Sequence, residues 1–325
     1  MRAWQVVHHG EPVDALRLVD VAPPDPAPTE VRVRVGAAAL GLPDVLMCRG
    51  SYPLTPVLPF TPGQEVAGIV TCAGAQSGIP IGTRVMAVTS FFAGHGGFAE
   101  ETLAAAHSTF PVPGEMSDVE AAGFFIAYHT AWVALVQRGR LQPGERLLVL
   151  GAGGGTGAAA VSLGRALGAQ VIAAAGGADK GAYCRSLGAH AVIDQPAELL
   201  AQAIFTAAGG HGVDLIFDPV GGAVSTAAVQ CLANEGRLLV VGFASGEWVT
   251  ISLLDAVMRN YSVVGVMGAG RDHARDTAAH AELLRLYREG LIRTAPTRTA
   301  PFDQLPTALQ AVADRKSLGR IVVVP

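Results

Sequence analysis

The residues with the most recognisable chemistry are the glycines in the segment Gly-Ala-Gly-Gly-Gly-Thr-Gly, positions 151–157. A short apolar run, Arg146 to Leu150, precedes them like a buried strand, and an alanine-rich run, Ala158 to Leu167, follows like a buried helix. A glycine turn between strand and helix leaves room for the phosphates of a dinucleotide, and the helix N-terminus attracts their charge. Glycine spacing alone is a weak signal in a chain with 40 glycines, but the flanking elements strengthen it. The sequence therefore predicts a dinucleotide-binding turn.

The next strand indicates which dinucleotide fits. An acidic residue that holds the ribose 2′-hydroxyl is expected at its end, about 20 residues beyond the turn. That strand reads Val171 to Ala175, and Gly176-Gly-Ala-Asp-Lys180 follows, so the strand end carries no carboxylate. Lys180, one of only two lysines, offers a cation to a 2′-phosphate. Both observations favour NADPH, and the alternative is that Lys180 is a solvated residue in the first turn of a helix.

The elements around these residues fall into two kinds. From Arg146 to Val241 short apolar runs alternate with helical segments, which predicts an α/β domain with a doubly wound parallel sheet. The first section instead contains short strands, such as the alternating Val31 to Val35, separated by glycine and proline, which predicts a partly open β-barrel. The last section lacks the alternation, and we expect it to rejoin the barrel. The predicted domains are residues 1–122 with 266–325, and residues 123–265.

Composition excludes several classes of function. The 325 residues are 50% hydrophobic and only 15% charged, which suits two domains with large cores. A net charge of −4 without a basic cluster argues against nucleic acid or an anionic membrane as partner. No apolar run has the length of a membrane span, and the N-terminus lacks the apolar core of a signal peptide. The four cysteines are scattered, as expected for reduced thiols in a cytoplasmic protein.

With these pieces placed, the chain resembles the medium-chain dehydrogenase/reductase superfamily, in its zinc-free quinone oxidoreductase (zeta-crystallin-like) branch. The segments that carry the resemblance follow one another along nearly the whole chain: Pro43–Pro53, Leu58–Val70, Leu141–Gly151, Ser186–Ala189, Gly212–Gly222, Gly236–Gly246 and Gly319–Pro325. The resemblance implies a groES-like barrel domain split around a Rossmann domain and NADPH as cofactor. It also implies a homodimer joined through the edge of the Rossmann sheet.

The resemblance also implies the cofactor-binding residues, in an order that runs from one end of the cofactor to the other. They are Thr130 at the nicotinamide ribose or phosphate, Gly154, Gly155 and Thr156 at the pyrophosphate, Gly176, Gly177 and Lys180 at the adenosine phosphate, and Phe243, Met267 and Gly268 beside the nicotinamide. Gln195 stands where some relatives carry a tyrosine against the adenosine phosphate, a departure that weakens the assignment of NADPH.

Two residues of the barrel section are candidates for catalysis. Tyr52 lies where the family lines its substrate cleft, and its hydroxyl would bond the acceptor oxygen or donate a proton. The alternative is that Tyr52 only walls the pocket. Asp44 matches an aspartate near the family's active site, with a helix-terminal role as the alternative. Many relatives carry asparagine where Gly41 stands, so an amide is missing from the substrate side and the acceptor is left open.

The positions of the catalytic zinc ligands in related alcohol dehydrogenases decide the metal question. A cysteine of those enzymes falls near Leu42 and a histidine at Gln64, and neither ligand is present here. An amide is a poor zinc ligand beside imidazole and thiolate, and His107 and His129 are isolated histidines. We therefore predict no metal.

Without a Lewis acid, an acceptor must spread the charge that accompanies hydride transfer through its own conjugation. The expected function is an NADPH-dependent quinone oxidoreductase that acts on a small quinone or similar conjugated carbonyl. The alternatives are an enone or enoyl-thioester reductase of the same superfamily and, from another class, a non-catalytic NADPH-binding protein.

Overall fold

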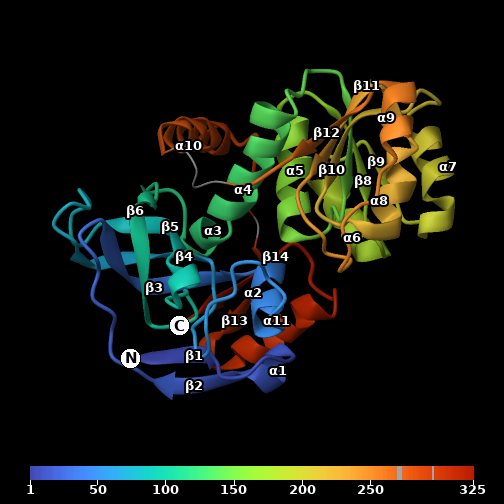
Figure 1. Cartoon of the computed structure of the whole chain (residues 1–325). Coiled ribbons are helices and arrows are strands. Elements are labelled where there is room, and N and C mark those ends of the chain that lie inside the picture. Colours follow the sequence, from blue (N-terminus) through green and yellow to red (C-terminus); the bar gives the residue numbers. More distant parts are fainter. Residues whose placement is uncertain (269–272, 295) are drawn as a thin grey trace. The chain divides into compact units, whose positions relative to one another are not determined.

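The computed structural model describes residues 1–268, 273–294 and 296–325, and the chain forms two compact units (Figure 1). The barrel unit comprises Met1–Ile126 with Thr294–Pro325, and the Rossmann unit comprises Ala127–Arg293. The fold class predicted from the sequence is confirmed: one unit holds a partly open antiparallel barrel and the other a parallel sheet with helices.

The unit boundaries differ from the predicted ones, which followed residues 122 and 265. The larger difference concerns helix α10 (His273–Arg288), which belongs to the Rossmann unit rather than to the barrel. Its residue His280 meets His129 of helix α4 (Phe125–Trp132), and the Tyr128 hydroxyl donates to the carbonyl oxygen of Arg293. These long-range contacts leave no trace in the local pattern of the sequence.

Strand β3 (Glu30–Leu40) is the centre of the barrel unit, because it pairs with β4, β6 and β14. The pairing of β3 with β6 closes strands β3 to β6 on themselves, and β14 and β13 extend the sheet from β3. The strands of this unit are β1 (Arg2–Val6), β2 (Leu16–Asp20), β3, β4 (Glu65–Ala73), β5 (Arg84–Thr89), β6 (Glu101–Pro111), β13 (Pro296–Pro301) and β14 (Arg320–Val324). Its helices are α1 (Pro12–Ala15), α2 (Leu42–Cys48), η1 (Phe91–Ala93), α3 (Asp118–Ala122), η3 (Phe302–Gln304) and α11 (Leu305–Ala313).

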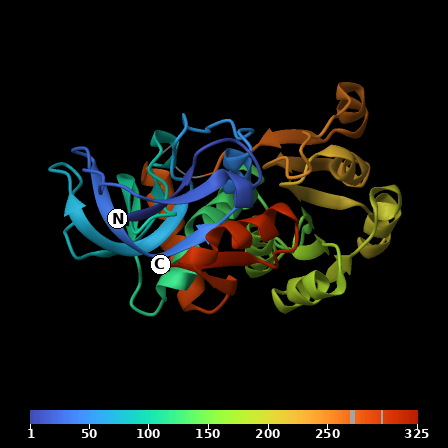
Figure 2. The same ribbon diagram turned by 90° about the horizontal axis from the view of Figure 1, so that it is seen from below.

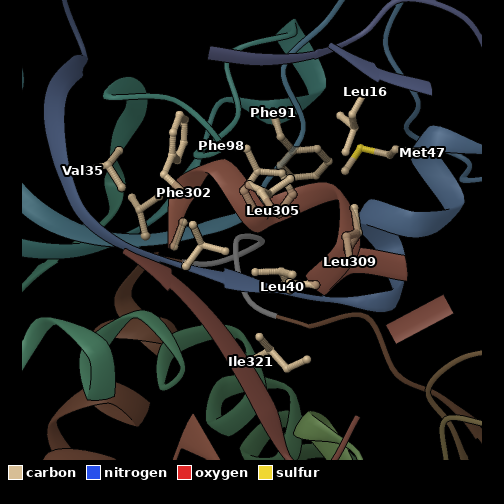
Figure 3. Close-up of a cluster of buried hydrophobic side chains, with 14 of the residues drawn as sticks. Leu16, Val35, Leu40, Met47, Phe91, Phe98, Phe302, Leu305, Leu309 and Ile321 are labelled. Atoms are coloured by element: carbon tan, nitrogen blue, oxygen red, sulfur yellow. The ribbon is translucent and has the colours of Figure 1, made fainter. Parts of the chain in front are cut away.

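Segments from both ends of the chain build the core of the barrel unit. Val31, Val33 and Val35 are buried, as the alternation along β3 predicted. Figure 3 shows Leu305 and Leu309, one helical turn apart on α11, among the side chains of this core. Figures 1 and 2 show the C-terminal strands beside the N-terminal part of the chain, in agreement with the pairing of β14 with β3.

The Rossmann unit contains a six-stranded sheet in the order β12-β11-β10-β7-β8-β9, and every pairing in it is parallel. Its strands are β7 (Arg146–Leu150), β8 (Gln170–Ala174), β9 (Ala191–Ile193), β10 (Val213–Asp218), β11 (Leu232–Val240) and β12 (Ser262–Gly265). Its helices are α4, the π-helix η2 (Val133–Arg138), α5 (Gly155–Ala166), α6 (Ala178–Ser186), α7 (Ala197–Ala207), α8 (Gly222–Val229), α9 (Leu253–Arg259) and α10. The strand order reverses between β7 and β10, and open parallel sheets bind ligands at that point.

None of the helices in the described part of the chain combines the length and the hydropathy needed to cross a membrane.

Candidate functional site

The glycine turn lies at the carboxyl end of β7, at the point where the strand order reverses. Gly151 has φ +59°, and a Cβ on Gly157 would collide with the carbonyl oxygen of Gly151. The turn and the first residues of α5 therefore approach as closely as glycine allows. The N-cap of α5, Gly154, contributes no side-chain acceptor, and the first turn contains no acidic residue. The first N–H groups of this helix are thus suited to bind a pyrophosphate.

Lys180 of α6 lies against the same turn. A Cβ built on Gly153 would come within 2.9–3.0 Å of Cβ, Cγ and Cδ of Lys180, so the lysine stem covers this glycine. Gly177, which precedes α6, has φ +90°, and a Cβ added there would meet nothing within 4 Å. The structure therefore brings two of the predicted adenosine-phosphate residues, Gly177 and Lys180, to the edge of the sheet that carries the predicted pyrophosphate turn.

An acidic residue that the sequence analysis did not single out also lies here. Oδ2 of the exposed Asp194 accepts a hydrogen bond from the N–H of Gly177 at 2.8 Å. The parallel pairing of Ala174 with Ile193 explains this position, because Asp194 directly follows β9 at the same edge of the sheet. The missing carboxylate of β8 is therefore partly replaced by one from the neighbouring strand, a relation that only the strand order reveals.

The residues expected beside the nicotinamide cluster around α4 and the segment after β12. A Cβ on Gly268 would lie 2.9 Å from Oγ1 of Thr130, so these two predicted residues are packed together. Met267, next to Gly268, is exposed. Phe243 follows β11, and its ring lies 4.5 Å from that of Trp248 at an angle of 35°. Trp248 was not anticipated, because an aromatic residue in a glycine-rich loop has no periodic pattern to mark it.

Asp218 fixes the turn that supports this loop. It is fully buried at the carboxyl end of β10, and its Oδ1 accepts hydrogen bonds of 2.9 Å from the N–H groups of Val220 and Gly221. A Cβ on Gly221 would collide with the carbonyl oxygen of Glu247, which brings the turn into contact with the loop after β11. Oδ2 of Asp218 is buried and has no hydrogen-bond partner within the described residues. The sequence contained this aspartate in a family segment but gave it no role.

His129, adjacent to Thr130, pairs with His280 of α10. Nε2 of His129 lies 3.1 Å from Nδ1 of His280, and both rings are buried. Burial, together with the neighbouring His280, lowers the pKa of His129 to about 3, and burial lowers the pKa of His280 to about 4. Both imidazoles are therefore neutral at pH 7, and the pair packs α10 against the helix that carries Thr130. This agrees with the sequence-based preference for a packed histidine at position 129.

In the barrel unit, Asp44 holds two backbone segments. Its Oδ2 accepts from the N–H of Gly41 at 2.8 Å, and its Oδ1 accepts from the N–H of Gly63 at 3.1 Å. The side chain is buried, and burial raises its pKa to about 7. This geometry matches the helix-terminal role that the sequence left open, because α2 begins directly after Gly41. A direct part for Asp44 in the chemistry stays a prediction.

Tyr52 begins a row of aromatic rings on the barrel unit. It is half-buried, its ring lies 6.5 Å from that of Phe91, and the Phe91 ring lies 5.7 Å from that of Phe92. Phe91 is part of the barrel core, whereas Phe92 is 61% exposed. The phenylalanine pair gives the surface next to Tyr52 an aromatic character that the sequence analysis had not assigned to it.

Comparison with known proteins gives a consistent family. Residues 27–114 match the model of the alcohol dehydrogenase GroES-like domain, and residues 155–284 match that of the zinc-binding dehydrogenases. The chain is 33% identical to quinone oxidoreductase-like protein 2 of Rattus norvegicus over 314 residues, which cover 95% of this chain and 88% of the relative. The chain belongs to the zinc-free quinone oxidoreductase branch of the medium-chain dehydrogenase/reductase superfamily.

Solved structures of this superfamily share the fold over the whole chain. A probable oxidoreductase from Mycobacterium abscessus is 38% identical, with a TM-score of 0.87 over 100% of this chain and 99% of that one. The quinone oxidoreductase of Escherichia coli, solved in complex with NADPH, is 26% identical, with a TM-score of 0.88 over 100% of both chains. The protein is accordingly an oxidoreductase of the medium-chain dehydrogenase/reductase superfamily.

The metal-ligand positions of this superfamily hold Leu42 and Gln64 here. Leu42 packs on the barrel core, and Gln64 is buried before β4. The described residues include no group of three or more histidine, cysteine or acidic side chains placed to hold a metal ion. The name of the second family model thus describes other members, and a metal-free site remains the prediction for this one.

Proposed function

We propose that the protein transfers a hydride from NADPH to a quinone or a similar conjugated carbonyl, without zinc. The observation that carries the proposal is the glycine turn at the strand-order reversal, with helix N–H donors at its centre and the Lys180 stem packed on Gly153. The Escherichia coli quinone oxidoreductase, a relative with the same fold, was solved in complex with NADPH. These features together support NADPH as the cofactor of this chain.

Each predicted cofactor residue then has a physical task. Gly154, Gly155 and Thr156 bind the pyrophosphate through the N-terminus of α5, because no side chain blocks the approach. Gly176, Gly177 and Lys180 face the adenosine phosphate. Thr130, Phe243, Met267 and Gly268 orient the nicotinamide, with the Trp248 ring behind Phe243.

When bound, NADPH supplies the hydride from nicotinamide C4. The acceptor takes up this hydride and one proton from water, which gives the hydroquinone and NADP⁺. The chain lacks the zinc ligands of the related alcohol dehydrogenases, so the acceptor has to disperse negative charge through its own π system. A quinone does so, and the protein contributes position, exclusion of water and hydrogen bonds from the barrel unit. Tyr52 is the proposed donor to the acceptor oxygen.

The same proposal includes a homodimer formed through the Rossmann sheet. Strand β12 lies at one end of this sheet and pairs only with β11, so its outer edge can add a strand from a second copy. Helix α9, which precedes β12, exposes Leu253, Leu254, Val257 and Met258 at 71–77%. An apolar surface of this kind next to an unpaired edge fits a self-complementary two-fold interface.

The dimer is tested by light scattering on the full chain. Met258→Glu should convert dimers into monomers, and Leu199→Glu, which alters an exposed leucine on α7, should leave the dimer intact. A monomeric wild type would rule this interface out.

The reaction is tested by following NADPH absorbance with ortho- and para-quinones, enones and an enoyl-thioester in parallel. Preferred turnover of quinones supports the proposal, and preferred turnover of enones or the thioester supports the alternative reductase. Tight NADPH binding without turnover of any acceptor would support the non-catalytic alternative. Activity that a chelator abolishes and zinc restores would contradict the metal-free chemistry.

A further inference from the structure

Gly41 and Gln64 are distant in sequence but share one anchor in the barrel unit. The Asp44 carboxylate accepts a hydrogen bond from the Gly41 N–H with one oxygen and from the Gly63 N–H with the other. Gln64 directly follows Gly63, and its carbonyl oxygen accepts from the Thr89 N–H at 3.0 Å. The backbone of Gln64 is thus fixed on the same carboxylate that fixes Gly41.

The side chain of Gln64 is in an unusual state. Gln64 is only 8% exposed, and its Nε2 is buried without a hydrogen-bond partner among the described residues. Leaving an amide donor buried and unpaired lowers stability, so native proteins rarely retain one without a reason. A neighbouring methionine or leucine would fill the same space without that cost. The unpaired donor therefore indicates a ligand acceptor atom that completes its hydrogen bonding.

We propose that the Gln64 amide donates a hydrogen bond to the carbonyl oxygen of the acceptor, and so replaces the amide that relatives carry where Gly41 stands. The inference rests on the proposed hydride transfer and deepens it. As the hydride arrives, negative charge grows on the acceptor oxygen, and a donor held in place beforehand stabilises that charge. Gln64 keeps both of its amide protons throughout, because the proton that completes the product comes from water.

The primary test is Gln64→Met in the full chain, with quinone turnover, NADPH affinity and melting temperature measured together. Loss of a donor to a developing oxyanion should lower kcat and kcat/KM together by about 10²-fold. NADPH affinity should be unchanged, because the predicted cofactor residues lie in the Rossmann unit. The melting temperature should be equal or higher, since an unpaired buried amide has been removed. The matched control is Gln76→Met, at an exposed glutamine of the same unit, which should leave all three quantities unchanged.

A second variant separates a substrate contact from a structural effect. Gly41→Asn in the Gln64→Met background should recover about tenfold of the lost kcat, because it restores an amide on the other segment held by Asp44. Gly41 has φ −135°, and a Cβ there would lie 3.3–3.5 Å from its nearest neighbours, so asparagine fits after small shifts. Its melting temperature checks that it does.

Unchanged quinone kinetics in Gln64→Met, or a joint fall of kcat and melting temperature without rescue, would overturn the proposal. A wild-type protein that reduces no acceptor would instead overturn the proposed function, which distinguishes the two failures.

Discussion

The two units hold their candidate sites by opposite means. In the Rossmann unit the site is made of backbone: glycines at 151, 153, 157 and 221 approach neighbouring atoms so closely that a side chain would collide. In the barrel unit it is held by buried polar side chains, namely Asp44, Gln64 and the ion pair between Glu65 and Arg320. A phosphate needs N–H donors and space, which bare backbone provides. A varied acceptor needs particular side chains, and these must be fixed by contacts between distant segments.

The largest expected effect comes from breaking the buried ion pair of the barrel unit. Glu65 is 1% exposed, receives Arg320 and the N–H of Ile126, and burial raises its pKa. Glu65→Gln leaves the Arg320 charge without its counter-charge, and unfolding free energy should fall by about 3–5 kcal/mol. Urea denaturation measures this change. NADPH affinity at low urea should stay the same, and a loss of affinity would show that the two kinds of site are not independent.

The corresponding change in the Rossmann unit is Gly157→Ala. The added methyl group would collide with the Gly151 carbonyl, so we expect a loss of about 1–3 kcal/mol and of most NADPH binding. The control is Gly154→Ala, whose Cβ would lie 3.4 Å from the same carbonyl oxygen. It should keep the stability and weaken NADPH binding only. Equal stability of the two variants would show that backbone contact does not shape the turn.

The two units should also respond to pH in opposite directions. The folded-state pKa of Asp44 is raised to about 7 from 3.8, so the folded barrel binds the extra proton between these values. The contribution of Asp44 to stability is therefore fully present below about pH 4 and falls as pH rises to 7. His129 and His280 have lowered folded-state pKa values, about 3 and 4 against 6.5, so their contribution is present above pH 6.5 and is lost on acidification.

Each such group changes the pH slope of stability by at most about 1.4 kcal/mol per pH unit. Denaturation of His280→Asn and Asp44→Asn between pH 4 and 7.5 separates the two effects. The histidine variant should lose stability less steeply on acidification than the wild type, and the aspartate variant more steeply. Slopes that change in the same direction would contradict the assignment.

The smallest expected effect is that of Lys180→Ala. The loss of one cation should weaken NADPH binding by about tenfold, or 1.4 kcal/mol, and leave NADH binding unchanged. Titration of both cofactors by fluorescence at two salt concentrations measures this difference, which should shrink at high salt. Equal losses for NADPH and NADH would assign Lys180 to packing on Gly153 rather than to the 2′-phosphate.

The same contrast explains what the sequence could predict. The parallel sheet, the glycine turn and the barrel follow from local patterns, because each depends on neighbouring residues along one strand or turn. The place of α10 depends instead on His280 meeting His129, 151 residues earlier in the chain. Asp194 reaches Gly177 only because β9 pairs with β8, and the aromatic contact of Trp248 with Phe243 depends on the fold of one loop. Gln64 was recognised as a missing zinc ligand, but the unpaired state of its amide appears only in three dimensions.

The partnership of Glu65 with Arg320 has a consequence for the order in which the protein is made. The two residues are 255 positions apart, and the whole Rossmann unit is synthesised between them. While the chain grows on the ribosome, β3 lacks its neighbour β14 and the Glu65 carboxylate lacks its cation. The Rossmann unit is continuous in sequence and can fold as soon as Arg293 has emerged, whereas the barrel must stay incomplete until almost the last residue. Synthesis therefore completes the cofactor unit first and the substrate unit last.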